Sequence, residues 1–165
     1  MQFDKTISGR VVTPLKVIDN GCIGIKSGKI AKVDKIKNFS LSINHSDFGN
    51  SFIFPGIIDG QTHSGSYLGF KGIESTSRSA ICGGITTIVD MPYDNPSPIT
   101  NIDLLKEKIR AIKEFAICDI ALYGTVLPGE GISKVGRMID SGIAAIKVSS
   151  IENHPTRFPR IPSNE

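Results

Sequence analysis

The first part of the chain alternates short β-branched runs with residues typical of tight turns. Asn20-Gly21 and Ser27-Gly28 tolerate the positive φ that a two-residue hairpin turn requires. The apolar segments of strand length that surround them are 11–12, 17–18, 22–25 and 30–33. This pattern predicts a small β-meander over residues 2–37. Residues 38–50 are polar and predict a linker or an exposed strand pair.

From residue 51 onward, apolar runs of strand length alternate with segments whose apolar residues recur every three or four positions. This alternation is typical of βα units around a parallel sheet. The expected strands are 52–59, 86–91, 120–126 and 144–148, and the expected helices are 74–81, 103–115 and 133–139. In helix 103–115 the charged residues are expected on the solvent face. They are Lys106, Glu107, Lys108, Arg110 and Lys113.

The composition is that of an ordinary globular protein. The 165 residues are 39% hydrophobic and 21% charged, which excludes a disordered or collagen-like chain and favours one domain by length. The net charge is only +3, so we expect no nucleic-acid partner and no membrane partner. The first residues lack a signal-peptide pattern, and a cytoplasmic protein is expected. Cys22, Cys82 and Cys118 are isolated, which favours reduced thiols.

Chemistry-bearing side chains follow the expected parallel strands. In a βα-barrel the loops after the strands build the active site. His63 at such a position is a candidate metal ligand or base, or simply a hydrogen-bonded histidine. Lys147 lies at the end of an apolar strand. Because burying an unpaired ammonium group is costly, its side chain either reaches solvent or has a functional role. The strand-end segments are 59–63, 90–95, 125–128 and 147–150.

Four segments carry recognisable motifs, namely IFPGIIDGQTH at 53–63, ICGGITTIVDMP at 81–92, AIK at 145–147 and FPRIP at 158–162. Together they resemble the opening of a known family, the cyclic amidohydrolases of the allantoinase, dihydroorotase and dihydropyrimidinase group. The resemblance covers only the N-terminal portion of such an enzyme. It implies an α/β fold in which residues 1–50 belong to a small N-terminal β-sandwich. Residues 51–165 would then form about the first four βα units of a (β/α)8 TIM-type barrel.

The resemblance also implies a metal-dependent hydrolase that opens a cyclic amide such as allantoin or a hydantoin. His63 corresponds to the second histidine of the family's HxH pair, and Lys147 corresponds to its carboxylated lysine. Gln61 stands in place of the first histidine. The implied cofactor is zinc or another divalent metal, up to two ions per complete barrel. Such a metal lowers the pKa of bound water to about 7 and so supplies a hydroxide.

The chain departs from this family at three positions. An amide oxygen binds zinc more weakly than imidazole does, so Gln61 predicts poor metal occupancy. Gly65 and Tyr93 stand where dihydroorotases carry a substrate-gripping arginine and an asparagine. The absence of that arginine and asparagine argues against a carboxylate substrate. Gln61 also leaves a second interpretation open, a non-catalytic amidohydrolase-like protein with a structural or regulatory role.

Length is the larger departure from the family. Only 115 residues follow Asn50, whereas a (β/α)8 barrel needs about 200 or more. We therefore expect an N-terminal fragment that is inactive alone. An open half-barrel exposes strand edges and apolar surface, so a homo-oligomer is expected. His45 and His154 match no family ligand, and a surface position is expected for both.

Overall fold

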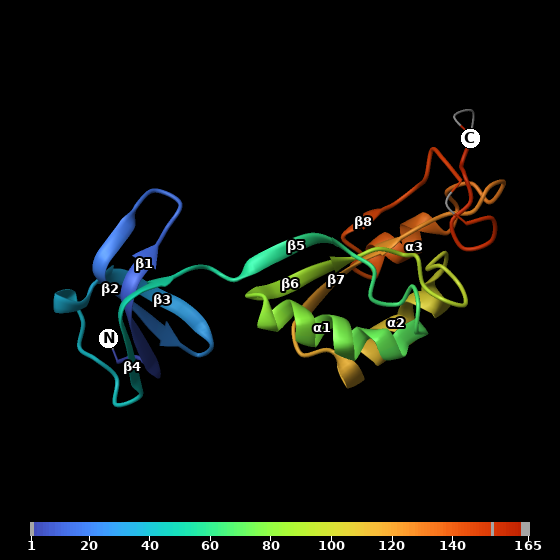
Figure 1. The fold of residues 1–165 in the computed structure, drawn as a ribbon. Helices are drawn as coiled ribbons and strands as arrows, with labels where there is room; N and C mark the ends of the chain where they lie inside the picture. Colours follow the sequence, from blue (N-terminus) through green and yellow to red (C-terminus); the bar gives the residue numbers. More distant parts are fainter. Residues whose placement is uncertain (1, 153, 163–165) are drawn as a thin grey trace. The chain divides into compact units, whose positions relative to one another are not determined.

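The computed structural model describes residues 2–152 and 154–162. The chain divides into two compact units between Pro55 and Gly56, and each unit has its own four-stranded sheet (Figure 1). The first unit contains β1 (Lys5–Val12), β2 (Val17–Lys26), β3 (Lys29–Lys35), the short helix η1 (Ile36–Asn38) and β4 (His45–Ile53).

The sheet of the first unit has the order β3-β2-β1-β4. The pairs β1–β2 and β2–β3 are antiparallel, as a meander requires, and β4 runs parallel to β1. Ser27 and Gly28 connect β2 to β3 with φ values of 51° and 72°. This turn therefore has the positive φ angles of a two-residue hairpin loop that the sequence predicts.

The sequence also predicts a hairpin turn at Asn20-Gly21, but the structure places both residues inside β2. The pairing with β1 shifts register there, since Gly9 pairs with Gly21 while Val11 pairs with Ile18. Asn20 has a φ of 51°. The residues form a β-bulge, which uses the same tolerance for positive φ as a turn does.

The polar segment after the meander becomes β4. At its end, Phe52 lies opposite Arg10 and Ile53 lies opposite Val11 of β1. The sequence assigns these apolar residues to the first barrel strand, but they complete the first sheet instead, because the edge of β1 supplies backbone hydrogen-bond partners. Pro55 then ends the pairing, and the division between the units falls after it rather than after residue 50.

His45 begins β4 and is half-buried rather than a solvated linker residue. Thr6 Oγ1 lies 2.9 Å from its Nδ1, and Ser8 Oγ lies 3.2 Å from its Nε2. Ser8 Oγ also donates to Asp47 Oδ1 at 2.8 Å. A neutral imidazole with its proton on Nε2 satisfies every one of these contacts. His45 therefore links β1 to β4, which the sequence does not indicate.

Replacing His45 by leucine is expected to lower the free energy of unfolding by about 1–2 kcal/mol, because the fully buried Thr6 hydroxyl loses its acceptor. Urea denaturation of the variant and the parent chain measures this loss. Asn50→Leu, an exposed position on the same strand, is the control and is expected to stay within about 0.5 kcal/mol of the parent. Equal losses in the two variants would contradict the role of His45.

The second unit is a curled parallel sheet of order β5-β6-β7-β8, with a helix between each pair of successive strands (Figure 1). This arrangement confirms the expected βα units. No helix in the described part of the chain is long and apolar enough to cross a membrane. The elements are β5 (Ile57–Thr62), η2 (Gly69–Lys71), α1 (Gly72–Cys82), β6 (Ile85–Asp90), α2 (Ile102–Phe115), β7 (Asp119–Gly124), α3 (Val135–Asp140) and β8 (Ala145–Ile146).

Helix α2 packs on the sheet through a core cluster of Ile99, Leu105, Leu122 and Met138. The helix begins after Asn101, whose side-chain oxygen accepts the backbone N–H groups of the first turn, as an N-cap does. Lys108 contradicts the expected solvent face, because its side chain is fully buried. The physical reason is its position three residues after Leu105, which places it on the packed side of the helix.

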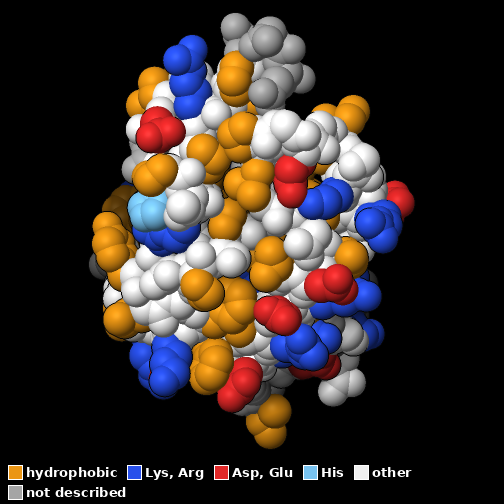
Figure 2. Space-filling view, turned by 90° about the vertical axis from the view of Figure 1, so that its right-hand side faces the viewer, with side chains coloured by type: hydrophobic (Ala, Val, Ile, Leu, Met, Phe, Trp, Pro, Cys, Tyr) orange, Lys and Arg blue, Asp and Glu red, His pale blue; other side chains and the backbone are white. Residues whose placement is uncertain are grey.

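Apolar side chains remain exposed on β5, one of the two outer strands of the second unit. Among the described residues, β5 pairs only with β6, and β8 pairs only with β7. Ile57 and Ile58 of β5 are 55% and 66% exposed. Figure 2 shows one face of the molecule, on which hydrophobic side chains lie between basic and acidic ones. An unpaired strand edge of this kind is a template for pairing with further strands.

Candidate active site

Two of the expected site residues lie at the carboxyl end of β5. Gln61 is inside the strand and exposed, and His63 follows the strand and is half-buried. The backbone N–H of Gln61 donates to Asp59 Oδ1 at 3.0 Å. The carboxyl ends of parallel strands are where βα-barrel sites are built, so both residues lie where the sequence predicts.

Lys147, the third expected residue, directly follows β8. Its backbone N–H donates to Gly124 O at 2.9 Å, and its carbonyl accepts the Thr125 hydroxyl at 2.6 Å. Burial lowers the pKa of His63, the carboxylate of Asp90 opposes that effect, and the charge of Lys147 lowers the pKa further. The structure therefore brings His63 and Lys147 within electrostatic reach of each other, although they lie far apart in the sequence.

An aromatic stack lies beside His63. The ring centroid of Tyr93 is 5.1 Å from that of His63 and 3.5 Å from that of Phe158. Arg157 Nη1 donates to Ser66 O at 2.7 Å and to Tyr93 O at 3.1 Å. The segment after β8 is thereby tied onto the loops that follow β5 and β6.

His154 shapes the turn that presents these two residues. Its Nδ1 accepts the backbone N–H of Arg157 at 3.2 Å, and its backbone forms a β-bridge with Phe158. The ring is half-buried. His154 is thus a hydrogen-bonded turn residue rather than the solvated surface histidine that the sequence suggests.

A buried charged cluster lies beneath the strand ends. Lys108 Nζ is 2.8 Å from Asp90 Oδ2 and 2.8 Å from Asp94 Oδ2, and no side chain of the three is more than 1% exposed. Burial raises the pKa of Asp94 to about 6, and the ammonium group of Lys108 only partly opposes this effect. The cluster therefore holds one carboxyl group that titrates well above its ordinary range.

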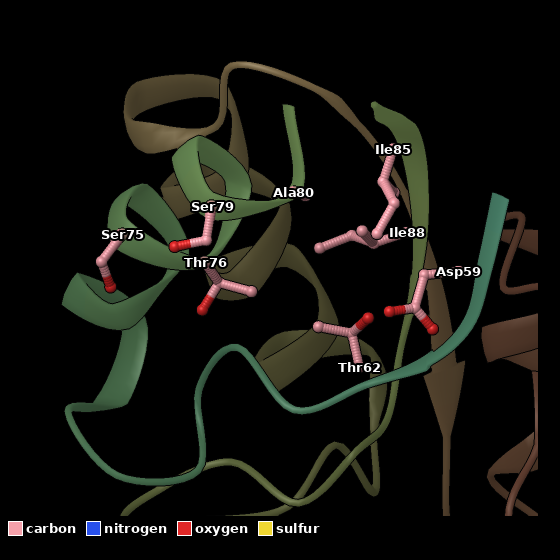
Figure 3. Close-up of a pocket in the computed structure, with 8 residues that line it drawn as sticks. All are labelled: Asp59, Thr62, Ser75, Thr76, Ser79, Ala80, Ile85 and Ile88. Atoms are coloured by element: carbon pink, nitrogen blue, oxygen red, sulfur yellow. The ribbon is translucent and has the colours of Figure 1, made fainter. Parts of the chain in front are cut away.

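A pocket of about 390 Å³ lies between α1 and the strands β5 and β6 (Figure 3). Thr62 Oγ1 is buried here and has no hydrogen-bond partner among the described residues. A polar group entering the pocket would satisfy it. This pocket does not include His63 in its lining. It is lined by Asp59, Thr62, Ser75, Thr76, Ser79, Ala80, Ile85 and Ile88.

The expected metal ligands do not form a complete site by themselves. Within residues 2–152 and 154–162, no group of three or more His, Cys, Asp or Glu side chains is placed to hold a metal ion. His63 offers an imidazole, which suits zinc, whereas Gln61 offers an amide and Lys147 an amine. A stable metal centre here needs further donor atoms.

Sequence reasoning missed several residues that organise this region. The charge of Lys108 predicts a solvent-exposed position, although its spacing from Leu105 is the signal that places it on the packed face. Asp90 lies in a segment that carries the family resemblance, but no pattern shows that it is paired with Lys108. Arg157 precedes the FPRIP segment and carries no local signal of its contacts.

Comparisons with known proteins agree with this geometry. No family model matches the chain. The chain is 30% identical over 160 residues to an allantoinase of Arabidopsis thaliana, covering 92% of this chain and 31% of that protein. It is 31% identical over 169 residues to an L-hydantoinase of Paenarthrobacter aurescens, covering 99% of this chain and 36% of that protein.

Comparison with solved structures also finds similarity to hydantoinases. The L-hydantoinase from Arthrobacter aurescens superposes with a TM-score of 0.88 at 28% identity, covering 99% of this chain and 36% of that one. A D-hydantoinase superposes with a TM-score of 0.70 at 23% identity and supports the fold alone. The chain spans about a third of the length of the relatives that it matches.

Fold and comparisons together define a class of protein, the α/β proteins that combine a small β unit with a separate parallel βα sheet, as the L-hydantoinase structure does. The chain belongs to the cyclic amidohydrolase superfamily and matches an N-terminal portion of its members, as the strand-end motifs indicate.

Proposed function

We propose that these residues form the N-terminal third of a metal-dependent enzyme that hydrolyses a C–N bond in a ring such as allantoin or a hydantoin. The observation that carries the proposal is the joint placement of His63 and Lys147 at the strand ends. It is supported by 30% and 31% identity to an allantoinase and an L-hydantoinase. Those relatives act on small cyclic amides by name, and the same substrate class is proposed here.

His63 is suited to donate a lone pair in this proposal. Burial and nearby positive charge lower its pKa, so the imidazole is neutral near pH 7. Lys147, as a carboxylated lysine, and Gln61 are proposed as further ligands for zinc or another divalent metal. Within residues 2–152 and 154–162, no group of three or more His, Cys, Asp or Glu side chains is placed to hold a metal ion, so we propose that the remaining donors come from elsewhere. We therefore propose that this chain alone does not turn over substrate.

Gln61 favours a second candidate function, a non-catalytic amidohydrolase-like protein that keeps the fold for assembly or regulation. Self-association through the exposed edges of β5 and β8 fits either candidate. The cytoplasmic location and the lack of nucleic-acid and membrane partners stay predictions.

Reading the codons after Glu165 and assaying the encoded protein tests the enzyme proposal. Further strand-end histidines and a late aspartate, together with ring opening of allantoin or hydantoin, are expected. Two equivalents of tightly bound zinc per chain would exclude the non-catalytic candidate. A continuous reading frame without such residues, and no hydrolysis of either ring, would contradict the enzyme proposal.

Replacing Gln61 by histidine is expected to raise the affinity of the chain for Zn²⁺ by about tenfold, because a second imidazole then lies two residues from His63 on the same strand end. Titration calorimetry with Zn²⁺ measures the change. Gln2→His, at an exposed position in the first unit, is the matched control. The same gain in both variants would mean that Gln61 is not the defect in this metal site.

A further inference from the structure

The chain on both sides of His63 is hydrogen-bonded to the end of β6 or to the residue that follows it. The carbonyl of Thr62 accepts the backbone N–H of Met91 at 2.8 Å. On the other side, the backbone N–H of Ser64 donates to Asp90 Oδ1 at 2.8 Å, and the Ser64 hydroxyl donates to Asp90 Oδ2. The position of His63 therefore depends directly on where the Asp90 carboxylate is held.

The loop after His63 is also bonded to the segment around Tyr93. A Cβ atom on Gly65 would lie 1.9 Å from Asp94 Oδ1, so the carboxylate packs directly on the loop backbone. The backbone N–H of Asn95 donates to Gly65 O at 3.0 Å. Asp94 thus fixes the residues on either side of it, Tyr93 and Asn95, against the loop of His63.

Lys108 connects these two anchors. Its Nζ is 2.8 Å from Asp90 Oδ2 and 2.9 Å and 2.8 Å from the two oxygens of Asp94. The three residues come from the end of β6, the loop after it and helix α2. Two carboxylates held together away from water need such a counter-charge, because an unpaired buried charge is costly.

We propose that Lys108, Asp90 and Asp94 form a positioning cluster that sets the orientation of the His63 and Tyr93 rings at the strand-end site. The cluster acts through Ser64 and Gly65, so its members are positioning residues and not catalytic ones. Its importance for hydrolysis rests on the proposed function, whereas its effect on the two rings does not.

Stability alone does not account for this arrangement. Well-packed apolar side chains of the same volume are often as stabilising as a buried ion pair, or more so. What apolar side chains do not supply is directional bonding. The two hydrogen bonds from Ser64 to Asp90 and the contact of Asp94 with Gly65 specify one loop geometry beside His63.

Nuclear magnetic resonance on the full chain tests the proposal, because its three histidines provide separate ring signals. In Lys108→Met, we expect the ring C–H signals of His63 to move, since the stacked Tyr93 ring shifts away. The Ser64 amide is expected to exchange with solvent about tenfold faster, as loss of a charge-assisted hydrogen bond implies. Signals of His45, which lies in the other unit, are expected to stay in place.

Lys106→Met is the matched control, because Lys106 is exposed on the same helix. If Lys108→Met does not fold, Asp94→Asn provides the test, since it keeps side-chain size and the Lys108–Asp90 pair. The Asn95 amide is then expected to exchange about tenfold faster than in the parent chain.

Two outcomes would overturn the proposal. One is unchanged His63 signals together with unchanged exchange at Ser64 and Asn95. The other is faster exchange of all amides in the second unit with no movement of the His63 signals, which would indicate general destabilisation without an effect on the rings. Neither measurement needs metal or substrate. The positioning proposal is therefore tested independently of the hydrolase proposal, which the zinc and ring-opening assays test.

Discussion

Replacing Lys108 by methionine is expected to lower the free energy of unfolding of the second unit by about 3–5 kcal/mol. Its ammonium group is fully buried and lies 2.8 Å from carboxylate oxygens of Asp90 and Asp94. Methionine fills a similar volume without a charge, so the two carboxylates lose their counter-ion in a region from which water is excluded. Removing one partner of a buried ion pair costs more than the pair itself contributes, because the remaining charge is left uncompensated.

Urea denaturation at pH 7.5 measures this loss, with Lys106→Met as the control. Lys106 has the same chemistry on the same helix but lies in solvent, so its replacement is expected to change the free energy of unfolding by less than about 0.5 kcal/mol. Equal denaturation midpoints for the two variants would show that Lys108 is not needed to compensate the aspartates.

The free energy of unfolding of the second unit is also expected to fall as the pH rises from about 4 to 6.5. Burial raises the pKa of Asp94 from 3.8 to about 6. Between these values the native state keeps a proton that the unfolded chain has released, so raising the pH favours unfolding. The stabilisation is fully present below the unfolded pKa and is lost as the pH passes the folded pKa. The shift corresponds to about 3 kcal/mol.

The variant Asp94→Asn isolates this contribution. Its stability is expected to decline less than that of the parent chain over the same pH range, because the titrating group is gone. Other carboxyl groups, such as Asp34 and Asp47 with their lowered pKa values, contribute equally to both proteins. Asp103→Asn, at an exposed position, is expected to keep the parent's pH dependence. A parental slope in Asp94→Asn would contradict the raised pKa.

The positions of the expected ligands follow from local pattern. Gln61 and His63 follow an apolar run of strand length, and Lys147 ends another. Since parallel strands of βα units present their carboxyl ends at one edge, such residues are brought to one region whatever the details of packing. This reasoning predicts that His63 and Lys147 lie at the same edge of the sheet, and the charge of Lys147 is one of the causes that lower the pKa of His63.

Local sequence patterns do not predict the role of a residue when that role depends on what packs against it. The spacing of Lys108 from Leu105 puts it on the packed face of α2, but only its contacts with Asp90 and Asp94 explain why its charge is buried there. His45 is held by Thr6 and Ser8, which are nearly forty residues away in the sequence. A charged or polar side chain is assigned to solvent by default, and only its partners in space reverse that assignment.

The sequence by itself determined the succession of a β unit and βα units, the family and the strand-end positions of Gln61, His63 and Lys147, because these depend on periodicity and short motifs. The tertiary structure alone decided that residues 45–53 complete the first sheet and that Lys108, Asp90 and Asp94 meet beneath His63. The physical reason is that strand pairing and burial of charge are settled by residues distant in sequence, whose approach no local pattern specifies.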